Sequence, residues 1–286
     1  MVLSNSTRDK LVDTNPSPHN YLPTGDAAGV IVIPAASPSV EPIPGADDDH
    51  KPGRPLQNEF VLFHEYGHLL AHRLKIWSGN NWVNELVPNI FMNTYLVQSR
   101  TDLDFVLQDR RKNPRPALRY TSLADLDYLY GAVGAENYYW FQFQLERIAD
   151  FLAQGQTMPG IATKLQSEFP AGRQKQETLD ELNGRFSRIR AGFLEMAGSL
   201  AGPTTISKND PAACGDATPG TSRTTVAVDN RSSRPVVLTL FDGATRTIQP
   251  QSWLAVGAVV GAPIKLADGR CVVPRSEPTL TIIESE

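Results

Sequence analysis

Two histidines four residues apart place the strongest constraint on the fold of this chain. They begin and end the segment His-Glu-Tyr-Gly-His at residues 64–68, inside a stretch at 57–77 whose apolar residues recur with helical spacing. Residues four apart lie on the same face of a helix, so His64 and His68 can present their imidazole nitrogens to one point. The pattern predicts an amphipathic helix that carries two ligands for a single metal ion.

The residue types in this segment favour a catalytic zinc ion. Zinc accepts imidazole nitrogen as a ligand and lowers the pKa of a water that it binds towards neutrality. Glu65 follows the first histidine directly and can take the proton of that water as the water attacks a carbonyl carbon. We therefore expect bound Zn²⁺, with His64 and His68 as ligands and Glu65 as the general base. The plain alternative is a surface or half-buried helix that carries two histidines by coincidence.

A catalytic zinc site needs a third protein ligand and keeps one position open. His72 continues the same helical face, but it lies two turns beyond His64, and each turn rises about 5.4 Å. Three ligands along one straight helix cannot meet at one ion, so His72 is expected to be structural or exposed. No histidine follows it in the chain, which leaves His19 and His50 upstream.

Glu85 is the better candidate for the third ligand. A Ser-Gly-Asn-Asn sequence at 78–81 is suited to end the first helix, because Gly and Asn accept left-handed backbone conformations. A second helix is predicted at 82–99. If the two helices run antiparallel, Glu85 returns to the side of His68. The alternative is an ordinary solvated carboxylate on a helix.

The segment at 59–96 resembles the gluzincins, the thermolysin and aminopeptidase group of zinc metallopeptidases. In that family an Asn-Glu pair on the helix after the His-Glu-x-x-His helix supplies the third zinc ligand, and here Asn-Glu stands at 84–85. The resemblance implies His64, His68 and Glu85 as zinc ligands. It also implies a zincin-like fold and hydrolysis of peptide bonds.

Several positions depart from the family pattern. The interval between His68 and Glu85 is shorter than in thermolysin. Gluzincins often carry a carboxylate one turn after the third ligand, where it orients the first histidine; Asn89 stands there instead, and its amide oxygen can still accept a hydrogen bond. The aminopeptidase signature Gly-x-Met-Glu-Asn is absent. The metzincin group is excluded, because Ala71 and Leu74 stand where it requires Gly and His.

Hydrolysis of a peptide bond also needs a donor for the oxyanion that forms on the carbonyl oxygen. Thermolysin-like enzymes use a downstream histidine, which this chain lacks, and the aminopeptidase branch uses a tyrosine. Tyr138 and Tyr139 are the candidates, in an aromatic cluster that opens a helix predicted at 136–154. The alternative is that these aromatic residues belong to the core.

Outside the segment just described, the sequence up to residue 201 predicts mainly helices. A β-branched run at 30–33 is the best early strand, and further helices are predicted at 124–130, 161–169 and 176–200. Together with the resemblance, this predicts a zincin-like metallopeptidase domain at 1–201 with a small N-terminal sheet.

The last third of the chain has a different character. A stretch at 202–222 is rich in Pro, Thr, Ser and Gly and predicts a linker. The short alternating runs that follow predict a small all-β module at 223–286, an antiparallel β-sandwich. The whole chain is therefore expected to be an α+β protein.

Charge and cysteine content limit the partners and the location. The 286 residues carry a formal net charge of −4, whereas nucleic acid or an anionic membrane requires a basic surface. No apolar run approaches the length of a membrane span.

A disulfide between Cys214 and Cys271 is expected, with two free thiols as the alternative, and it would favour an extracellular or periplasmic location. No signal peptide is visible in this sequence, so a cytoplasmic location stays open. The sequence does not specify an oligomeric state.

Together these features predict a zinc-dependent hydrolase that cleaves peptide bonds in a peptide or protein substrate. A second class is a catalytically degenerate peptidase-fold protein that binds zinc and a partner without turnover. Glu65 speaks against that class, whereas Asn89 and the unassigned oxyanion donor keep it open. A third class gives the main role to the β module as a carbohydrate or cell-surface binding unit, although Trp253 is its only tryptophan.

Overall fold

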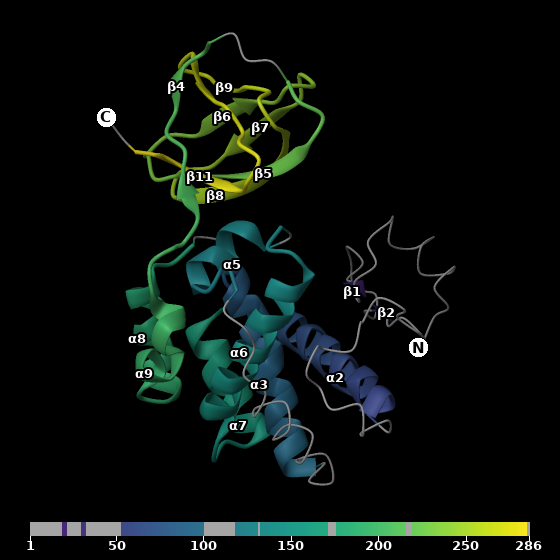
Figure 1. Cartoon of the computed structure of the whole chain (residues 1–286). Coiled ribbons are helices and arrows are strands. Elements are labelled where there is room, and N and C mark those ends of the chain that lie inside the picture. The colour runs from purple at the N-terminus through teal and green to yellow at the C-terminus, as the bar shows by residue number, and fades with distance from the viewer. Residues whose placement is uncertain are drawn as a thin grey trace.

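The computed structural model of the chain describes residues 19–21, 30–32, 53–99, 118–130, 132–170, 176–215 and 219–284, and at 19–21, 30–32, 53–61 and 135 it describes the backbone only. A short strand pair comes first, helices fill the middle of the chain, and strands form its C-terminal part. The molecule thus belongs to the α+β class, as expected. The strands of the C-terminal part lie at one end of the helices (Figure 1).

The N-terminal strands form an antiparallel pair that lies beside the first helix (Figure 1). They are β1 (His19–Tyr21) and β2 (Val30–Val32), and β2 coincides with the predicted early strand. The helices that follow are α2 (Gly53–Arg73), α3 (Asn81–Ser99), α5 (Leu123–Leu129), α6 (Ala135–Ala153), α7 (Met158–Glu168), α8 (Leu179–Ile189), α9 (Phe193–Ala197) and the 3-10 turn η2 (Gly198–Ala201). Within the described ranges, none of these helices is both long and apolar enough to cross a membrane.

Two helix ends differ from the sequence prediction. The first helix ends at Arg73 instead of continuing to residue 77, and Lys75 adopts a left-handed backbone conformation with φ of 56°. The single helix predicted at 176–200 is two helices, because the chain turns at Gly192, whose φ is 93°. Apolar periodicity continues across both points, so it could not locate either break.

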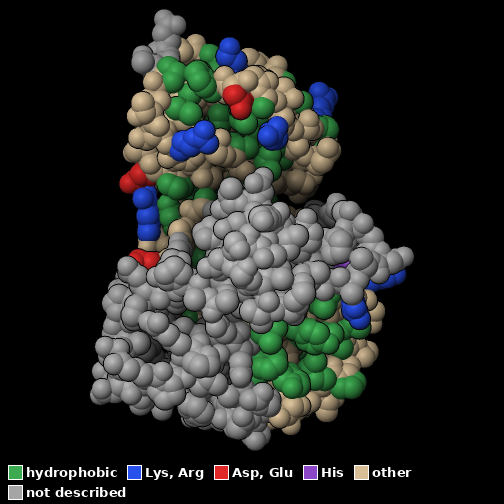
Figure 2. All heavy atoms as spheres, turned by 90° about the vertical axis from the view of Figure 1, so that its right-hand side faces the viewer, with side chains coloured by type: hydrophobic (Ala, Val, Ile, Leu, Met, Phe, Trp, Pro, Cys, Tyr) green, Lys and Arg blue, Asp and Glu red, His purple; other side chains and the backbone are tan. Residues whose placement is uncertain are grey.

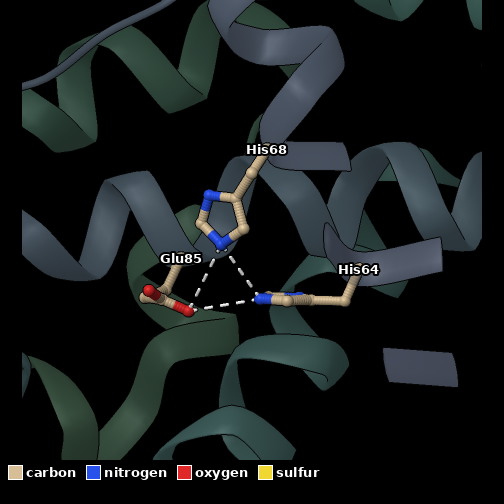
Figure 3. A group of neighbouring side chains, drawn as sticks. All are labelled: His64, His68 and Glu85. Atoms are coloured by element: carbon tan, nitrogen blue, oxygen red, sulfur yellow. Dashed lines mark hydrogen bonds and ion pairs between the residues drawn. The ribbon is translucent and has the colours of Figure 1, made fainter. Parts of the chain in front are cut away.

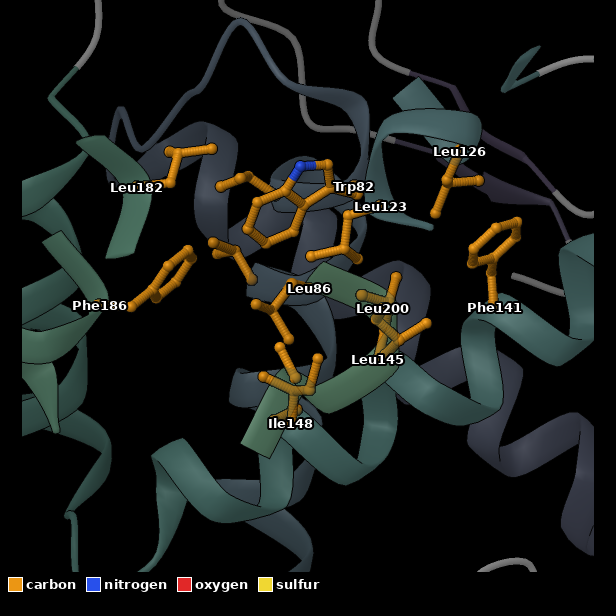
Figure 4. Packing of buried hydrophobic residues seen from close by; sticks show 14 of the residues in the cluster. Trp82, Leu86, Leu123, Leu126, Phe141, Leu145, Ile148, Leu182, Phe186 and Leu200 are labelled. Atoms are coloured by element: carbon orange, nitrogen blue, oxygen red, sulfur yellow. The ribbon is translucent and has the colours of Figure 1, made fainter. Parts of the chain in front are cut away.

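One apolar cluster holds the helices together (Figure 4). Trp82, at the start of α3, stacks on Phe193 with ring centroids 6.0 Å apart and also contacts Phe186. Leu86, one turn further along α3, is completely buried. Each such side chain stabilises the fold by about 1.5–3 kcal/mol through burial. The core therefore fixes α3, the helix that carries Glu85, against the rest of the helical part.

The C-terminal strands form two sheets. The five-stranded sheet has the order β4-β10-β9-β6-β7, and the four-stranded sheet has the order β3-β11-β5-β8. An apolar cluster that includes Val226, Leu238 and Ile283 takes side chains from both sheets. The strands are β3 (Ser207–Lys208), β4 (Ala212–Ala213), β5 (Arg223–Asn230), β6 (Val236–Thr239), β7 (Thr245–Ile248), β8 (Ser252–Val259), β9 (Ile264–Leu266), β10 (Arg270–Val272) and β11 (Thr279–Ile283).

The β part departs from the prediction of a purely antiparallel module. β11 runs parallel to both β3 and β5. The preceding strand, β10, belongs to the other sheet, so β11 does not arrive through a hairpin, and only a hairpin requires antiparallel pairing. In addition, β3 and β4 lie inside the predicted linker at 202–222, because two-residue strands are too short to show an alternating pattern.

The predicted disulfide is present. Cys214 and Cys271 are bonded; they stand 57 positions apart in the sequence, and 5.0 Å separates their Cα atoms. Cys271 lies in β10, and Cys214 directly follows β4, which pairs with β10. The bond therefore fastens the edge strand β4 to the five-stranded sheet.

The short helix α5 connects the helical part to the β part. The Asp125 carboxylate accepts hydrogen bonds from Thr204 Oγ1 at 2.6 Å and from the backbone N–H of Thr205 at 2.8 Å. The Tyr128 hydroxyl donates to Asp229 Oδ2 of β5 at 2.9 Å, and the Tyr128 ring meets Trp253 of β8 edge to face. Two positions of α5 thus hold the chain beyond residue 202.

The same helix also holds the start of α3. Asp127 Oδ1 accepts from the backbone N–H of Trp82 at 3.2 Å, and Oδ2 accepts from Asn80 Nδ2 at 2.8 Å. Burial raises the pKa of Asp127 to about 7, although these hydrogen bonds act in the opposite direction.

This pKa predicts a pH-dependent contribution to stability. The pKa in the folded protein lies above the ordinary aspartate value of 3.8, so the contribution is fully present below pH 4 and is lost as the pH rises to 7. The free energy of unfolding should therefore fall by about 1 kcal/mol per pH unit in this window relative to Asp127→Asn. Urea titrations of both proteins at several pH values measure the difference. Parallel curves for the two proteins would show that Asp127 does not titrate in this range.

Gly67 sets the distance between α2 and α3. A Cβ at this position would lie 2.6 Å from the carbonyl oxygen of Pro88 and 2.7 Å from its Cα, so only glycine lets the two helix backbones come this close. Pro88 lies inside α3, beyond the first turn where a proline is best tolerated. The closest approach is therefore next to His68 and within one turn of Glu85, which brings the two helices together at the candidate metal ligands.

Gly67→Ala should destabilise the protein by at least about 1–3 kcal/mol, because the new methyl group meets backbone atoms that cannot rotate away. Urea denaturation measures the effect. The matched control is Gly184→Ala in α8, where a Cβ would find only Arg188 Nη1 at 3.9 Å. That change should stabilise the helix by up to about 1 kcal/mol. Equal effects of the two substitutions would show that the α2–α3 contact is not tight.

Candidate metal centre

Three side chains converge between α2 and α3. His64 Nε2 lies 3.1 Å from His68 Nε2 and 3.3 Å from Glu85 Oε2, and His68 Nε2 lies 3.8 Å from the same oxygen. The two imidazole rings and the carboxylate point towards one another (Figure 3). Glu85 is 3% exposed, and the histidines are partly buried. The three side chains lie close enough together to bind one metal ion, as the sequence predicted.

The donor set and its spacing fit zinc. With Zn–N bonds of about 2.0–2.1 Å, tetrahedral geometry separates the ligand atoms by about 3.3–3.4 Å. The three distances of 3.1, 3.3 and 3.8 Å bracket this value. Two imidazoles disfavour Ca²⁺ and Mg²⁺, which prefer oxygen ligands. Three protein ligands also leave one position open, which is the arrangement of catalytic zinc sites.

Asn89 orients the first histidine. Its Oδ1 lies 2.8 Å from His64 Nδ1, so Nδ1 carries the hydrogen and donates it. In the neutral ring the lone pair is then on Nε2, the nitrogen that faces His68 and Glu85. The sequence prediction that Asn89 can accept a hydrogen bond in place of a family carboxylate is confirmed.

Two tyrosines hold the Glu85 carboxylate. The Tyr130 hydroxyl donates to Oε1, and the Tyr138 hydroxyl donates to Oε2 at 3.1 Å. Burial and the negative charge of Glu85 raise the pKa of both hydroxyls, so both stay protonated and act as donors. The carboxylate is thus held by the residue that follows α5 and by α6, in addition to its own helix.

The electrostatics of the cluster attract positive charge to its centre. Burial opposes a charge on Glu85, but the His64 hydrogen bond and the nearby histidines hold its pKa well below the usual range. Burial lowers the pKa of His68 to about 4. Burial acts in the same direction on His64, but its hydrogen bond with Glu85 and the charge of Glu85 outweigh it and raise the pKa to about 9. The carboxylate is therefore ionised and favours a positive partner at the imidazole nitrogens.

Glu65 lies next to this cluster. It is 7% exposed, although it stands on a helix whose neighbouring residue Tyr66 is 49% exposed. Its negative charge contributes to the raised pKa of His64, Tyr130 and Tyr138. Glu65 is therefore a buried carboxylate directly beside His64, one of the three candidate metal ligands.

The opposite face of the helices is apolar at the surface. Hydrophobic side chains gather on the helical part in the view of Figure 2. Leu62 and Tyr66 of α2, and Tyr95 and Val97 of α3, are exposed large hydrophobic residues. The His-Glu-x-x-His helix therefore turns its candidate metal ligands inward and part of its apolar surface outward.

Not every predicted residue takes part in the site. Tyr138 contacts Glu85, whereas Tyr139 is 45% exposed, and its ring contacts Tyr138. Among the described residues, no hydrogen bond joins Tyr139 to a ligand side chain. His72 is exposed and stands outside the ligand group, as expected.

Two residues of the site were not predicted. Tyr130 and Gln142 both donate hydrogen bonds to Glu85. Gln142 stands four residues after Tyr138 on the same face of α6, so helical spacing could have pointed to it once Tyr138 was chosen. Tyr130 follows the end of α5, and no local pattern connects it with Glu85.

A cavity of about 210 Å³ opens beside the ligands. His68, Glu85 and Tyr130 form part of its wall. The rest of the lining is mostly apolar and includes Ala71, Ile76, Trp77, Val83, Val87 and Phe169. The cavity offers room for part of a small molecule or a side chain in contact with the metal ligands.

Comparison with models of known protein families found no match for this chain, and a search of curated proteins found none either. The geometry of the residues is therefore the basis for assigning a function.

Proposed function

We propose that this protein is a zinc-dependent hydrolase of the gluzincin type that cleaves peptide bonds. The observation that carries the proposal is the convergence of His64, His68 and Glu85 with Glu65 buried beside them. Zinc peptidases require a pair of histidines four residues apart, a carboxylate as third ligand, and an adjacent carboxyl group for base catalysis. The proposal includes a zincin-like fold for the helical part of the chain and a β-sandwich for its C-terminal part. The disulfide also favours an extracellular or periplasmic location.

Each residue then has a defined task. His64, His68 and Glu85 would hold Zn²⁺, which when bound polarises water and a carbonyl group. Glu65 accepts the proton of the attacking water and passes it to the leaving amine. Asn89 keeps the His64 ring in the tautomer with its lone pair at Nε2. The mostly apolar cavity beside His68 and Glu85 has room for part of the substrate.

A second candidate is a zinc-binding protein without turnover. One observation favours it: the hydroxyls of both Tyr130 and Tyr138 donate to Glu85, so in this arrangement neither is directed to a substrate oxyanion. Binding of a partner peptide without cleavage would need the metal and the cavity but no oxyanion donor.

Metal content and proteolysis measured on one preparation test the proposal. Elemental analysis should find about one zinc per chain. Unfolded casein should be cleaved, and 1,10-phenanthroline should abolish cleavage until zinc is added back. Zinc without cleavage of casein or of a mixed peptide library would favour the second candidate. A chain without zinc after reconstitution would overturn both.

A further inference from the structure

A polar seam runs between α3 and α6. On α3 the buried residues Glu85, Asn89 and Asn93 stand four apart and thus share one face. They meet Tyr138, Gln142 and the backbone oxygen of Glu146 at the same spacing on α6. Buried polar groups in such a contact are costly unless they are paired, so each hydrogen bond in the seam constrains its neighbours.

Gln142 occupies the centre of this seam and uses both halves of its amide. Its Oε1 accepts from Asn89 Nδ2 at 3.1 Å. Its Nε2 donates to Glu85 Oε2 and, at 2.8 Å, to the Tyr138 hydroxyl. Asn89 in turn accepts from His64 Nδ1. Gln142 therefore connects two of the three ligand side chains, directly for Glu85 and through Asn89 for His64.

We propose that Gln142 is a positioning residue of the metal centre, which orients His64 and Glu85 at the same time. Acceptance by Gln142 Oε1 turns the NH₂ group of Asn89 towards α6, and this leaves Asn89 Oδ1 to face His64. That orientation makes His64 Nδ1 the protonated nitrogen and Nε2 the ligand. Donation from Gln142 Nε2 fixes the Glu85 oxygen that faces the imidazoles. The proposal rests on the metal site of the proposed function.

Only an amide side chain of this length can fill the position. An ionised glutamate accepts hydrogen bonds but cannot donate one. Methionine donates none and is only a weak acceptor. Asparagine keeps both groups but is one methylene shorter, so it cannot span the distance from Asn89 to Glu85. Outer-sphere partners of this kind typically change metal affinity by about 10–100-fold when they are replaced.

Zinc affinity measured by competition with a chromogenic chelator tests the proposal. Gln142→Met should raise the zinc Kd by about 10–100-fold. Gln144→Met is the matched control, because Gln144 stands two residues after Gln142 on α6 and accepts a hydrogen bond from Arg147 instead. The zinc Kd of this variant should equal that of the wild type. The visible spectrum of the Co²⁺-substituted protein should shift in Gln142→Met and stay constant in the control. An unchanged Kd and spectrum in Gln142→Met would overturn the proposal.

A double-mutant cycle tests the route through Asn89. Gln142→Met should cost less zinc affinity in an Asn89→Ala background than in the wild-type chain, because the His64 connection is already lost there. Full additivity would overturn this part of the proposal. Should Gln142→Met fail to fold, Gln142→Asn gives the same comparison with polarity retained.

These readouts separate the inference from the proposed function. A wild-type chain that binds zinc but cleaves no peptide would overturn the hydrolase activity alone, since the effect of Gln142→Met on the Kd can still be measured. A wild-type Kd in Gln142→Met would overturn the inference alone.

Discussion

Replacing Glu65 with glutamine is expected to lower kcat/KM for peptide hydrolysis by about 10²–10⁴-fold, the range that a positioned general base contributes. Glutamine has nearly the same shape but cannot accept the proton of the attacking water. Because Glu65 is not among the three converging ligand side chains, zinc content should stay at the wild-type value. Fluorogenic-peptide kinetics and elemental analysis on the same preparations measure both quantities.

Glu136→Gln supplies the matched control for the loss of one carboxylate. Glu136 is exposed in the first turn of α6, and its replacement should leave both activity and zinc content unchanged. If Glu65→Gln retains most of the wild-type rate, the base is another group and the role assigned to Glu65 is wrong. If it loses its zinc as well, Glu65 acts on the metal centre and the rate alone says nothing about proton transfer.

The second large effect is expected for Glu85→Ala. This change removes the proposed ligand oxygen, which lies within 3.8 Å of both imidazole nitrogens. Replacement of outer-sphere partners alone costs about 10–100-fold in affinity, so the loss of a direct ligand should exceed about 100-fold. The zinc Kd from chelator competition, together with elemental analysis after dialysis, measures it. Hydrolysis should fall with the bound zinc.

His72→Ala is the control for Glu85→Ala. His72 lies one turn beyond His68 on the same helix but is exposed and outside the ligand group. Zinc binding should be the same as in the wild type. Full retention of zinc in Glu85→Ala would move the third ligand elsewhere and remove the support for a gluzincin-type site.

The three ligand candidates could be predicted because they depend on short-range geometry. His64 and His68 need only one helical turn, and Glu85 needs one further helix that returns antiparallel after a short turn. The structure has this arrangement, and Gly67 against Pro88 supplies the close helix contact. Apolar periodicity and turn residues are enough to predict such a unit.

The partners of the ligands could not be predicted in the same way. Tyr130 and Gln142 stand 45 and 57 residues after Glu85, and their positions depend on how α5 and α6 pack against α3. The choice between Tyr138 and Tyr139 also depends on packing. Neighbours on a helix point about 100° apart, so only one of the two can face Glu85. The sequence alone offered both.

The fold of the β part shows the same limit. Alternating runs predicted strands near β5, β6, β8 and β11, but pairing partners and direction are long-range properties. The parallel pairing of β11 with β5 follows from the way the chain crosses between the two sheets, which no local pattern records.

Because α5 is hydrogen-bonded to both the helical part and the β part, the folding of one part depends on the other. Ala227 and Leu280 of the β part belong to the same apolar cluster as the helical core, and Tyr128 and Asp127 lie on one short helix but bond to opposite parts. A break in either part therefore exposes apolar surface and orphaned polar groups of the other. The two parts should melt as one cooperative unit, so loss of the β strands by heat or proteolysis would also release the α3 helix end that carries Glu85, the proposed third metal ligand.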